Sequence, residues 1–332
     1  MTPHERERIR LMVEVSRLYY DEQRSQQEIA DRLDVSRATV SRTLTQARGE
    51  GLVRITIRDP LADEERLERA LVETFGVRSA AVSRGGGVGG DLVSEDVAEL
   101  GSHALAAALA SEAVVGVTAS RAVGAVARRL APCSYPGATV VPLNGGWGPE
   151  GFDWHANANA RTLAERMRCT YLQCNAPAFV ASEATRAALL REPVIARVME
   201  AARACTVALV GVGQLDLDAS IVRSGYFTAH DLDLVTARGA VAQLGALFID
   251  RRGEPVPTAF DARCIGIATD ELRRIPTVIA VAAGRAKVEA LRAALSGGWV
   301  HTLVTDAATA QGVLDGATQG SRDRSGERRW AG

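Results

Sequence analysis

Short apolar runs alternate with helical segments through most of this 332-residue chain, and this alternation constrains the fold more than any other feature. Runs such as Val114–Thr118, Thr206–Val210 and Thr277–Val281 are apolar at consecutive positions, as strands covered on both faces are. Alanine-rich segments of helical length stand between them. The pattern predicts an α/β domain over residues 77–316, with a Rossmann-like, mainly parallel sheet between two layers of helices.

The predicted strands and helices follow one another in regular order. The strands are expected at residues 80–83, 114–118, 139–143, 170–173, 206–210, 246–249, 277–281 and 302–304. The helices are expected at residues 92–111, 122–130, 156–168, 183–204 with a break at Pro193, 285–296 and 306–314. Such a sheet binds its ligand beyond the carboxyl ends of its strands, so we expect the site there.

Residues 1–58 show a different pattern, that of three short helices. Apolar residues at helical spacing predict a first helix over residues 5–21. Ser25 and Glu28 then form a capping box, in which the serine oxygen caps an amide and the glutamate reaches back toward the serine. This capping box predicts the start of a second helix.

A short turn leads from the second helix into the third. Asp34 lies in the turn, and aspartate tolerates a left-handed backbone better than most residues. Ser36 is placed to cap a helix over residues 36–48, and residues 51–58 alternate as a strand or short wing. Together these features predict a helix-turn-helix domain of winged-helix type.

The exposed face of the third helix carries short polar side chains and arginines, which suit a helix lying in a major groove. We predict DNA contacts from Gln26, Ser36, Arg37, Thr39, Ser41, Arg42 and Arg54. The alternative is a plain three-helix bundle with a solvated face. The capping pair, the short turn and the run from Ser36 to Arg42 together favour DNA binding.

Residues 59–76 predict a helix between the two domains, because Pro60 opens the segment and Gly76 ends it. Leu67, Leu71 and Phe75 form one apolar stripe along this helix. The stripe either packs against the chain's own second domain or pairs two protomers, as a reader of palindromic DNA requires. The sequence leaves both interpretations open.

Small and polar residues follow the predicted strands of the second domain. Ser120 and Arg121 begin one predicted helix, and residues 284–287 begin another. Backbone amides at helix N-termini bind anions such as phosphate. Lys287 is the one lysine among 39 basic residues and lies at such a place, although a surface lysine retained by chance would look the same.

Composition narrows the class of protein. The net charge of −1 excludes a globally basic nucleic-acid binder, so DNA must be held by a local patch. The five cysteines form no CxxC pair and the five histidines show no paired spacing, so we expect no metal, no cofactor and no catalytic residues. No apolar run is long enough to span a membrane, and we expect a cytoplasmic protein with a disordered tail at residues 317–332.

The order of these segments resembles the SorC family of sugar-responsive bacterial transcriptional regulators over residues 5–316. The resemblance rests on residues 25–44, 115–118, 142–146, 176–180, 209–213, 248–253, 279–287 and 303–306. It implies a second domain related to sugar-phosphate isomerases and deaminases, which senses a ligand instead of converting it. It also implies a homodimer or homotetramer on double-stranded operator DNA.

The resemblance places a sugar, sugar phosphate or polyol effector at the strand ends. The effector-binding residues it implies, together with the strand-end analysis, are Thr118, Ser120, Arg121, Asn144, Gly145, Gly146, Gly213, Gln243, Asp250 and Lys287. Two positions depart from the family pattern. Ala122 stands where the family has threonine, and Gln243 stands where it has an acidic residue, so the effector chemistry is altered at both ends.

Two other interpretations compete with this one. A sugar-phosphate isomerase or deaminase with an appended DNA-binding head would need a general base, and Gln243 at the acidic position argues against it. A DNA-binding oligomer whose second domain binds nothing is opposed by Arg121 and Lys287 at the strand ends.

Overall fold

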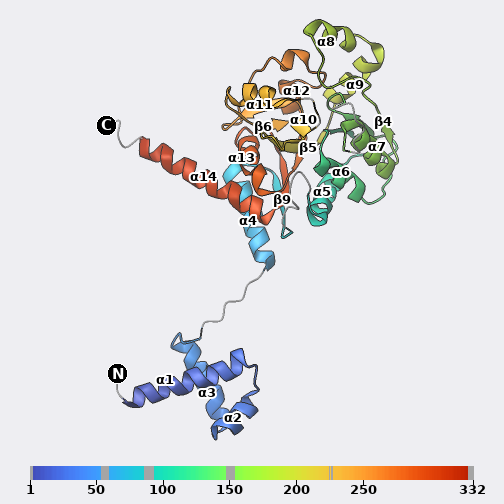
Figure 1. Ribbon diagram of the computed structural model, residues 1–332. Coiled ribbons are helices and arrows are strands. Elements are labelled where there is room, and N and C mark those ends of the chain that lie inside the picture. The colour runs from blue at the N-terminus through green and yellow to red at the C-terminus, as the bar shows by residue number, and fades with distance from the viewer. Residues whose placement is uncertain are drawn as a thin grey trace. The chain divides into compact units, whose positions relative to one another are not determined.

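The computed structural model describes residues 3–53, 60–85, 93–146, 154–223, 225 and 227–327. Of these, the side chains of residues 60–62 and 318–327 lie outside the description. The chain forms two compact units, Met1–Pro60 and Leu61–Gly332, drawn in Figure 1.

The first unit is a bundle of three helices. They are α1 (Pro3–Ser16), which continues through a π turn (Arg17–Asp21), α2 (Gln26–Leu33) and α3 (Arg37–Gly49). The bundle encloses an apolar core made of Val15, Leu18, Ile29, Ala30, Val40 and Leu44. At the end of α3, Glu50 accepts a hydrogen bond from Arg8 of α1 at 2.7 Å.

The predicted local geometry of the helix-turn-helix is confirmed. The Ser25 Oγ accepts a hydrogen bond from the Glu28 N–H at 3.3 Å, and the Glu28 carboxylate accepts one from the Ser25 N–H at 2.8 Å. Asp34 is left-handed, with φ 52° and ψ 48°, and closes α2. Ser36 caps α3 by accepting a hydrogen bond from the Thr39 N–H at 3.1 Å. Residues 54–58 of the predicted wing, Arg54 included, lie outside the described residues.

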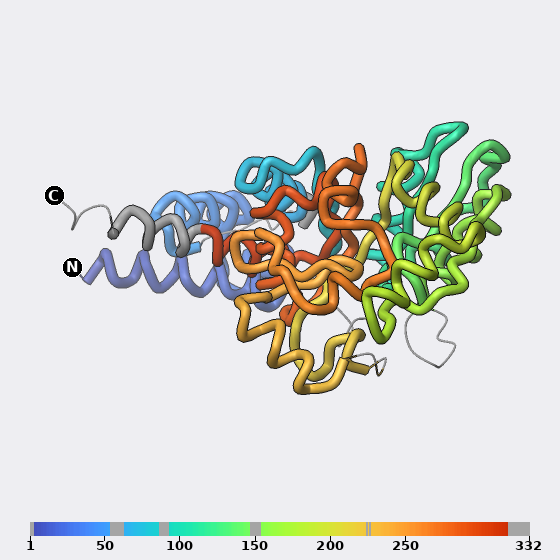
Figure 2. The backbone as a smooth tube through the Cα atoms, turned by 90° about the horizontal axis from the view of Figure 1, so that it is seen from above, coloured from blue at the N-terminus to red at the C-terminus, as the bar shows by residue number. Residues whose placement is uncertain are grey.

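The second unit is built on a mainly parallel sheet, as predicted. Its strands are β1 (Ser79–Ser83), β2 (Val114–Val117), β3 (Thr139–Pro142), β4 (Thr170–Tyr171), β5 (Val207–Gln214), β6 (Ala240–Leu244), β7 (Leu247–Asp250), β8 (Thr277–Val281) and β9 (Thr302–Asp306). The parallel order is β1-β9-β8-β5-β2-β3-β4. In Figure 2 the green segment, which carries β3 and β4, accordingly lies to one side of the orange and red segment that carries β8 and β9.

The strand predicted at residues 246–249 is β7, but its antiparallel pairing, the strand β6 and the extension of β5 were not predicted. β5 continues past Val210 to Gln214, and its last residues pair antiparallel with β6, which then pairs antiparallel with β7. The sequence prediction ended β5 early because Gly211 and Gly213 are typical of a loop. This β6–β7 hairpin (Ala240–Asp250) supplies one wall of the site described below.

Helices cover both faces of the sheet. They are α4 (Pro60–Phe75), α5 (Glu95–Ala108), α6 (Arg121–Arg129), α7 (Ala156–Met167), α8 (Glu183–Leu190), α9 (Pro193–Arg203), α10 (Ser220–Arg223), α11 (Ala229–Thr236), α12 (Thr269–Arg273), α13 (Val288–Ser296) and α14 (Ala307–Glu327). α5, α6 and α7 enclose one apolar core, and α4, α9, α13 and α14 contribute to the other. The short helices α10, α11 and α12 were not predicted.

The apolar stripe of α4 is buried inside the second unit. Leu67 is 4% exposed and Leu71 is 0% exposed, in the same core as Ala310 and Val313 of α14. Of the two open interpretations, packing against the chain's own domain is therefore the one that the structure supports. α14 itself runs to Glu327, whereas we expected disorder from residue 317, because the polar sequence there has no apolar periodicity.

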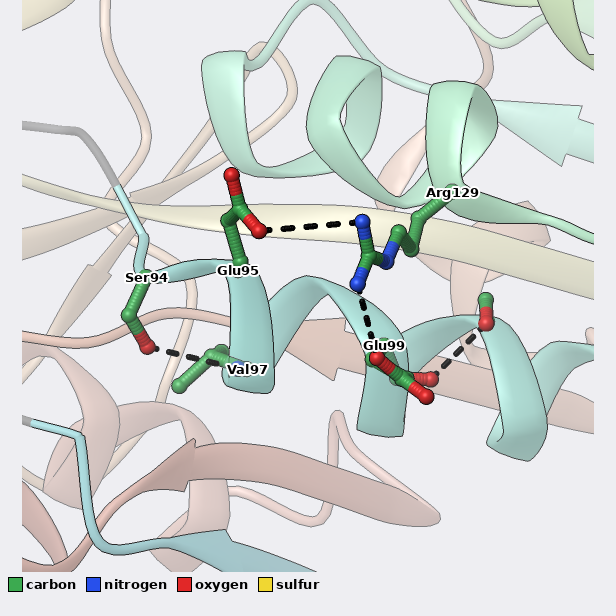
Figure 3. A network of polar contacts seen from close by, with 6 residues as sticks. Ser94, Glu95, Val97, Glu99 and Arg129 are labelled. Carbon is green, nitrogen blue, oxygen red and sulfur yellow. Dashed lines mark hydrogen bonds and ion pairs between the residues drawn. The ribbon is translucent and has the colours of Figure 1, made fainter.

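An exposed polar network joins α5 to α6 (Figure 3). Arg129 of α6 lies between Glu95 and Glu99 of α5, at 3.7 Å and 3.0 Å, and these carboxylates raise the pKa of the guanidinium. Ser94 caps α5 by accepting a hydrogen bond from the Val97 N–H. Exposed ion pairs add little stability. The network connects the last turn of α6 to the first turns of α5, at the end of α6 opposite to Arg121.

Candidate functional site

A cleft of about 640 Å³ opens at the carboxyl ends of β2, β5 and β8, where the sequence predicted it. It contains Ser120, Arg121, Gly213, Gln243 and Lys287 from the predicted effector set. Among its other lining residues are Trp154, Gln214 and Ser220. The described lining residues include two cations, Arg121 and Lys287, and no carboxylate.

The loop after β2 is held rigidly by one buried side chain. The Asn159 amide donates hydrogen bonds of 3.0 to 3.1 Å to three carbonyls, those of Thr118, Ser120 and Trp154. Ser120 then caps α6 by accepting a hydrogen bond from the Val123 N–H at 3.4 Å. The Arg121 guanidinium lies 5.7 Å from the centre of the Trp154 ring, within cation–π range. The start of α6 therefore presents a fixed positive charge to the cleft.

A second buried network holds the turn after β8. Gly284 has φ 108°, which only glycine adopts readily, and its N–H donates hydrogen bonds to Asp306 Oδ2 at 2.9 Å and Thr309 Oγ1 at 2.8 Å. This corrects one expectation, because the Gly284 amide serves Asp306 and Thr309 and not a ligand. Lys287 follows this turn, lines the cleft and is only 7% exposed, unlike a surface lysine kept by chance.

Two glutamines line the cleft from the antiparallel part of the sheet. Gln243 on β6 lies opposite Gly213 on β5, and its amide donates a hydrogen bond to the Gly245 carbonyl at 2.6 Å. Gln214 is 7% exposed, and its Oε1 has no hydrogen-bond partner among the described residues. Sequence reasoning missed Gln214 because it placed residues 211–214 in a loop. The only signal for it was the β-like alternation of Val210, Val212 and Gln214.

The structure separates the other predicted effector residues from this cleft. Thr118 and Asn144 line a neighbouring pocket instead. Gly145 and Gly146 line neither cavity: the Gly146 N–H donates to the Ala176 carbonyl at 2.8 Å, and a side chain at Gly145 would collide with that backbone.

Asp250 lies at the end of β7, away from the cleft. Its Oδ1 accepts hydrogen bonds from the N–H groups of Arg252 at 2.8 Å and Glu254 at 2.9 Å. These bonds close the turn after the hairpin, so the contacts of Asp250 are those of a turn residue. It lines neither of the two cavities that hold the other predicted residues.

The predicted DNA-binding face of α3 is largely open to solvent. Arg37, Ser41 and Arg42 are exposed, whereas Gln26 and Thr39 are half-buried. Ser36 is exposed, but its Oγ is used to cap α3. Arg37, Ser41 and Arg42 are therefore the most exposed of the described residues in this set and remain candidates for contacts to a phosphate or a base edge.

The described residues hold no group of three or more histidines, cysteines or acids placed to bind a metal, and no described helix is long and apolar enough to cross a membrane. Burial raises the pKa of Cys205 and Cys264 to about 12 and that of Cys169 to about 11. These thiols stay protonated at neutral pH and are poor nucleophiles.

Comparison with known proteins adds the following matches. A family model described as "Putative sugar-binding domain" matches residues 59–315, and a Crp-like helix-turn-helix model matches residues 15–70. The deoxyribonucleoside regulator of Bacillus subtilis (strain 168) is 28% identical over 311 residues, which cover 94% of this chain and 99% of that protein. The sorbitol operon regulator of Klebsiella pneumoniae is 26% identical over 313 residues, which cover 92% of this chain and 98% of that protein.

A solved structure agrees with these matches. The crystal structure of the full-length sorbitol operon regulator SorC from Klebsiella pneumoniae matches with a TM-score of 0.70 at 26% identity, and the match covers 92% of this chain and 98% of that one. The relatives named here are transcriptional regulators and not enzymes.

Proposed function

Because this chain belongs to the SorC family of sugar-responsive transcriptional regulators, we propose that its cleft binds a phosphorylated sugar or polyol that controls the binding of α3 to operator DNA. The DNA-binding and sugar-binding domains follow from the family. The phosphorylated effector and the residues that hold it are our proposal.

One observation carries the proposal: two cations from different strand ends, Arg121 and Lys287, line one cleft that has no carboxylate among its described lining residues. Lys287 is buried, so its charge acts through a medium of lower dielectric than water and attracts an anion strongly. Arg121 stands at the start of α6, where the helix dipole also favours an anion. Gln214 and Gln243 supply neutral amide groups that suit hydroxyls.

Operator control further requires that ligand binding alters the DNA-binding state. A ligand shifts such an equilibrium only by its difference in affinity between the two states. We propose that the active form is a dimer or a tetramer on a palindromic operator, since closed two-fold symmetry matches that of the DNA.

The direct test is binding of the full chain to DNA upstream of its own gene, titrated with matched sugars, polyols and their phosphates. We expect a salt-sensitive complex that a phosphorylated compound weakens or tightens selectively. An effect from the free sugar or polyol alone would contradict the phosphate assignment. No sequence-preferring complex under any condition would contradict operator binding itself.

The lysine content allows a second readout. Lys287 is the chain's one lysine, so reductive methylation modifies only its ε-amine and the N-terminal amine. A phosphate compound bound in the cleft should protect Lys287 and leave the N-terminal amine reactive. Equal methylation of Lys287 with and without the active compound would place the effector elsewhere.

A further inference from the structure

The strand β1 is held from its open side by helix α4. In the described sheet β1 pairs with β9 alone and forms one end of the parallel path. A backbone N–H on the open side of an edge strand needs a partner from another element. Glu68 of α4 supplies that partner, because its Oε1 accepts a hydrogen bond from the Val82 N–H at 2.9 Å. The side chain thus ties α4 directly to the backbone of the sheet.

A second glutamate of α4 makes a contact one helical turn earlier. The Glu64 Oε1 lies 2.8 Å from the Nε of Arg84, just beyond the end of β1. Arg84 is more than half exposed, so solvent weakens this ion pair. Val82 is buried, and its bond to Glu68 is therefore the less screened of the two contacts. Glu68 is the main polar tie between α4 and β1.

The orientation of α4 depends on this tie. Leu67 and Leu71 bury the helix in the core of the second unit, but apolar packing is not directional. A hydrogen bond requires a defined distance and angle, so Glu68 sets how α4 is aligned along β1. The first unit, which carries α3, ends at Pro60, where α4 begins. A change in the alignment of α4 therefore moves the point at which the chain leaves the second unit.

From Val82 the contacts continue across the sheet to β9. In the parallel register Val82 lies beside Thr305, and Ser83 lies beside Asp306. All four residues are buried. Thr305 Oγ1 has no hydrogen-bond partner among the described residues, whereas Asp306 has several. Asp306 is therefore the polar group through which this strand pair reaches its neighbours.

The last step leads from β9 to the cleft. Asp306 Oδ2 accepts a hydrogen bond from the Gly284 N–H at 2.9 Å, and the Gly284 carbonyl accepts one from the Lys287 N–H at 2.9 Å. Lys287 lines the cleft. Contiguous packed and hydrogen-bonded groups of this kind can carry energetic coupling between two sites. The contacts thus connect a cation of the cleft to the helix that follows the DNA-binding unit.

We propose that Glu68 is the positioning residue through which occupancy of the cleft changes the binding of α3 to operator DNA. This rests on the proposed function, which supplies an effector for the cleft. The route runs from Lys287 through Asp306 and β1 to Glu68. An effector that shifts the turn of Lys287 alters the bond between Glu68 and Val82, and with it the alignment of α4.

Three variants of the full chain test this role. Glu68→Ala removes the acceptor, Glu68→Gln keeps a carbonyl oxygen, and Glu73→Ala removes a charge from an exposed position on α4. Each is titrated with operator DNA, with and without the most active compound from the panel of sugars, polyols and phosphates. In Glu68→Ala the effect of that compound on operator affinity should shrink about three- to tenfold, the usual range for one hydrogen bond. The effect should recover in Glu68→Gln and stay normal in Glu73→Ala. Protection of Lys287 from methylation should show that all three variants still bind the compound.

Coupling between two sites is reciprocal, so a second arm needs no effector. Operator DNA should change the rate at which Lys287 is methylated in the wild type. This change should be lost in Glu68→Ala and retained in Glu73→Ala. Hydrogen exchange of the Val82 amide in the wild type, measured by mass spectrometry, requires no variant. It should also change when operator DNA binds.

The outcomes separate this inference from the proposed function. An equal effect of the compound on operator binding in Glu68→Ala and wild type would overturn the inference and leave the proposed function intact. Lower stability of Glu68→Ala in urea with a normal response would show that Glu68 only covers the sheet edge. Loss of compound binding in Glu68→Ala would place its role in the cleft itself and also overturn the inference.

A wild type that responds to no compound would contradict the proposed function, and the operator-DNA arm would still decide the inference. Lys287 methylation and Val82 exchange that operator DNA leaves unchanged would overturn the route. Changes in both that disappear in Glu68→Ala would support it even without a known effector.

Discussion

The Asp306 carboxylate, at the end of β9, accepts a hydrogen bond from the Gly284 N–H at the end of β8, with 2.9 Å between the two atoms. Asp306 is 1% exposed and also accepts from the N–H and hydroxyl of Thr309 at 2.8 and 2.7 Å. Lys287, one of the two cations of the cleft, follows Gly284 by three residues. Asp306 does not line the cleft, but it holds the turn that positions Lys287 in the cleft.

Asp306→Asn tests this positioning role. The carboxylate accepts three hydrogen bonds from Gly284 and Thr309, and the amide nitrogen of asparagine would set a donor against a backbone N–H donor in at least one of them. We therefore expect the variant to lose about 1–3 kcal/mol of unfolding free energy in urea. It should also lose protection of Lys287 from methylation by the active compound. Asp315→Asn, the same change at an exposed position on α14, the helix that follows Asp306, is the control. Loss of stability with normal protection of Lys287 would show that Asp306 supports the fold only.

Lys287→Ala should leave operator affinity intact and weaken the response to a phosphorylated effector at least tenfold, because a buried cation facing the anion is lost. Operator binding, measured by fluorescence anisotropy at increasing effector concentration, gives both the operator affinity and the size of the effector response. Arg285→Ala is the matched control, since Arg285 is exposed in the same turn and lies outside the cleft lining. Loss of both operator binding and effector response in Lys287→Ala would indicate a folding role.

Arg42→Ala should weaken operator binding without changing effector affinity. If Arg42 contacts a phosphate, the slope of log affinity against log salt should become less steep by about 1; if it contacts a base, affinity should fall by about 1–3 kcal/mol with relaxed sequence preference. Arg66→Ala removes the same charge from an exposed position on α4 and should change neither. Unchanged operator affinity in Arg42→Ala would refute the assignment of the recognition face.

Acidification should destabilise the second unit through His301. Its Nδ1 accepts a hydrogen bond from the Val278 N–H at 2.9 Å, and burial, with a smaller effect from Arg78, lowers the pKa of this histidine below 6.5. The unfolded chain therefore binds a proton that the folded chain excludes, and stability present above pH 6.5 is lost as the pH falls toward the folded-state pKa. Urea unfolding of wild type and His301→Gln at pH 7.5 and 5.5 should show a smaller pH effect in the variant. An identical pH effect would assign the loss to other groups, such as His155, whose pKa burial also lowers.

Local chemistry made the first unit easy to predict. The Ser25–Glu28 capping box, the left-handed Asp34 and the Ser36 cap each depend on residues a few positions apart, so the sequence contains all of the interacting groups. The parallel strands were predictable for a related reason, because burial on both faces leaves continuous apolar runs.

The shape of the site was harder to predict because it depends on long-range contacts. Asn159 holds the loop at Thr118 from 41 residues away, and Asp306 holds Gly284 from 22 residues away. No local pattern marks either pair. The prediction therefore named the strand ends correctly, yet grouped Thr118 and Asn144 with Lys287, although the structure divides them between two cavities.

The β6–β7 hairpin has a consequence for how effector preference can change. Its strands pair only with the end of β5 and with each other, while the seven-stranded parallel path continues without them. Yet the hairpin and its turn contribute Gln243 to the cleft, Leu244 and Leu247 to the neighbouring pocket that Thr118 and Asn144 line, and Gly245 to both. Leu244, Phe248 and Ile249 of the hairpin are buried in the apolar cores, so the changes that can retune the sensor for a new molecule are confined to lining positions such as Gln243 and Gly245.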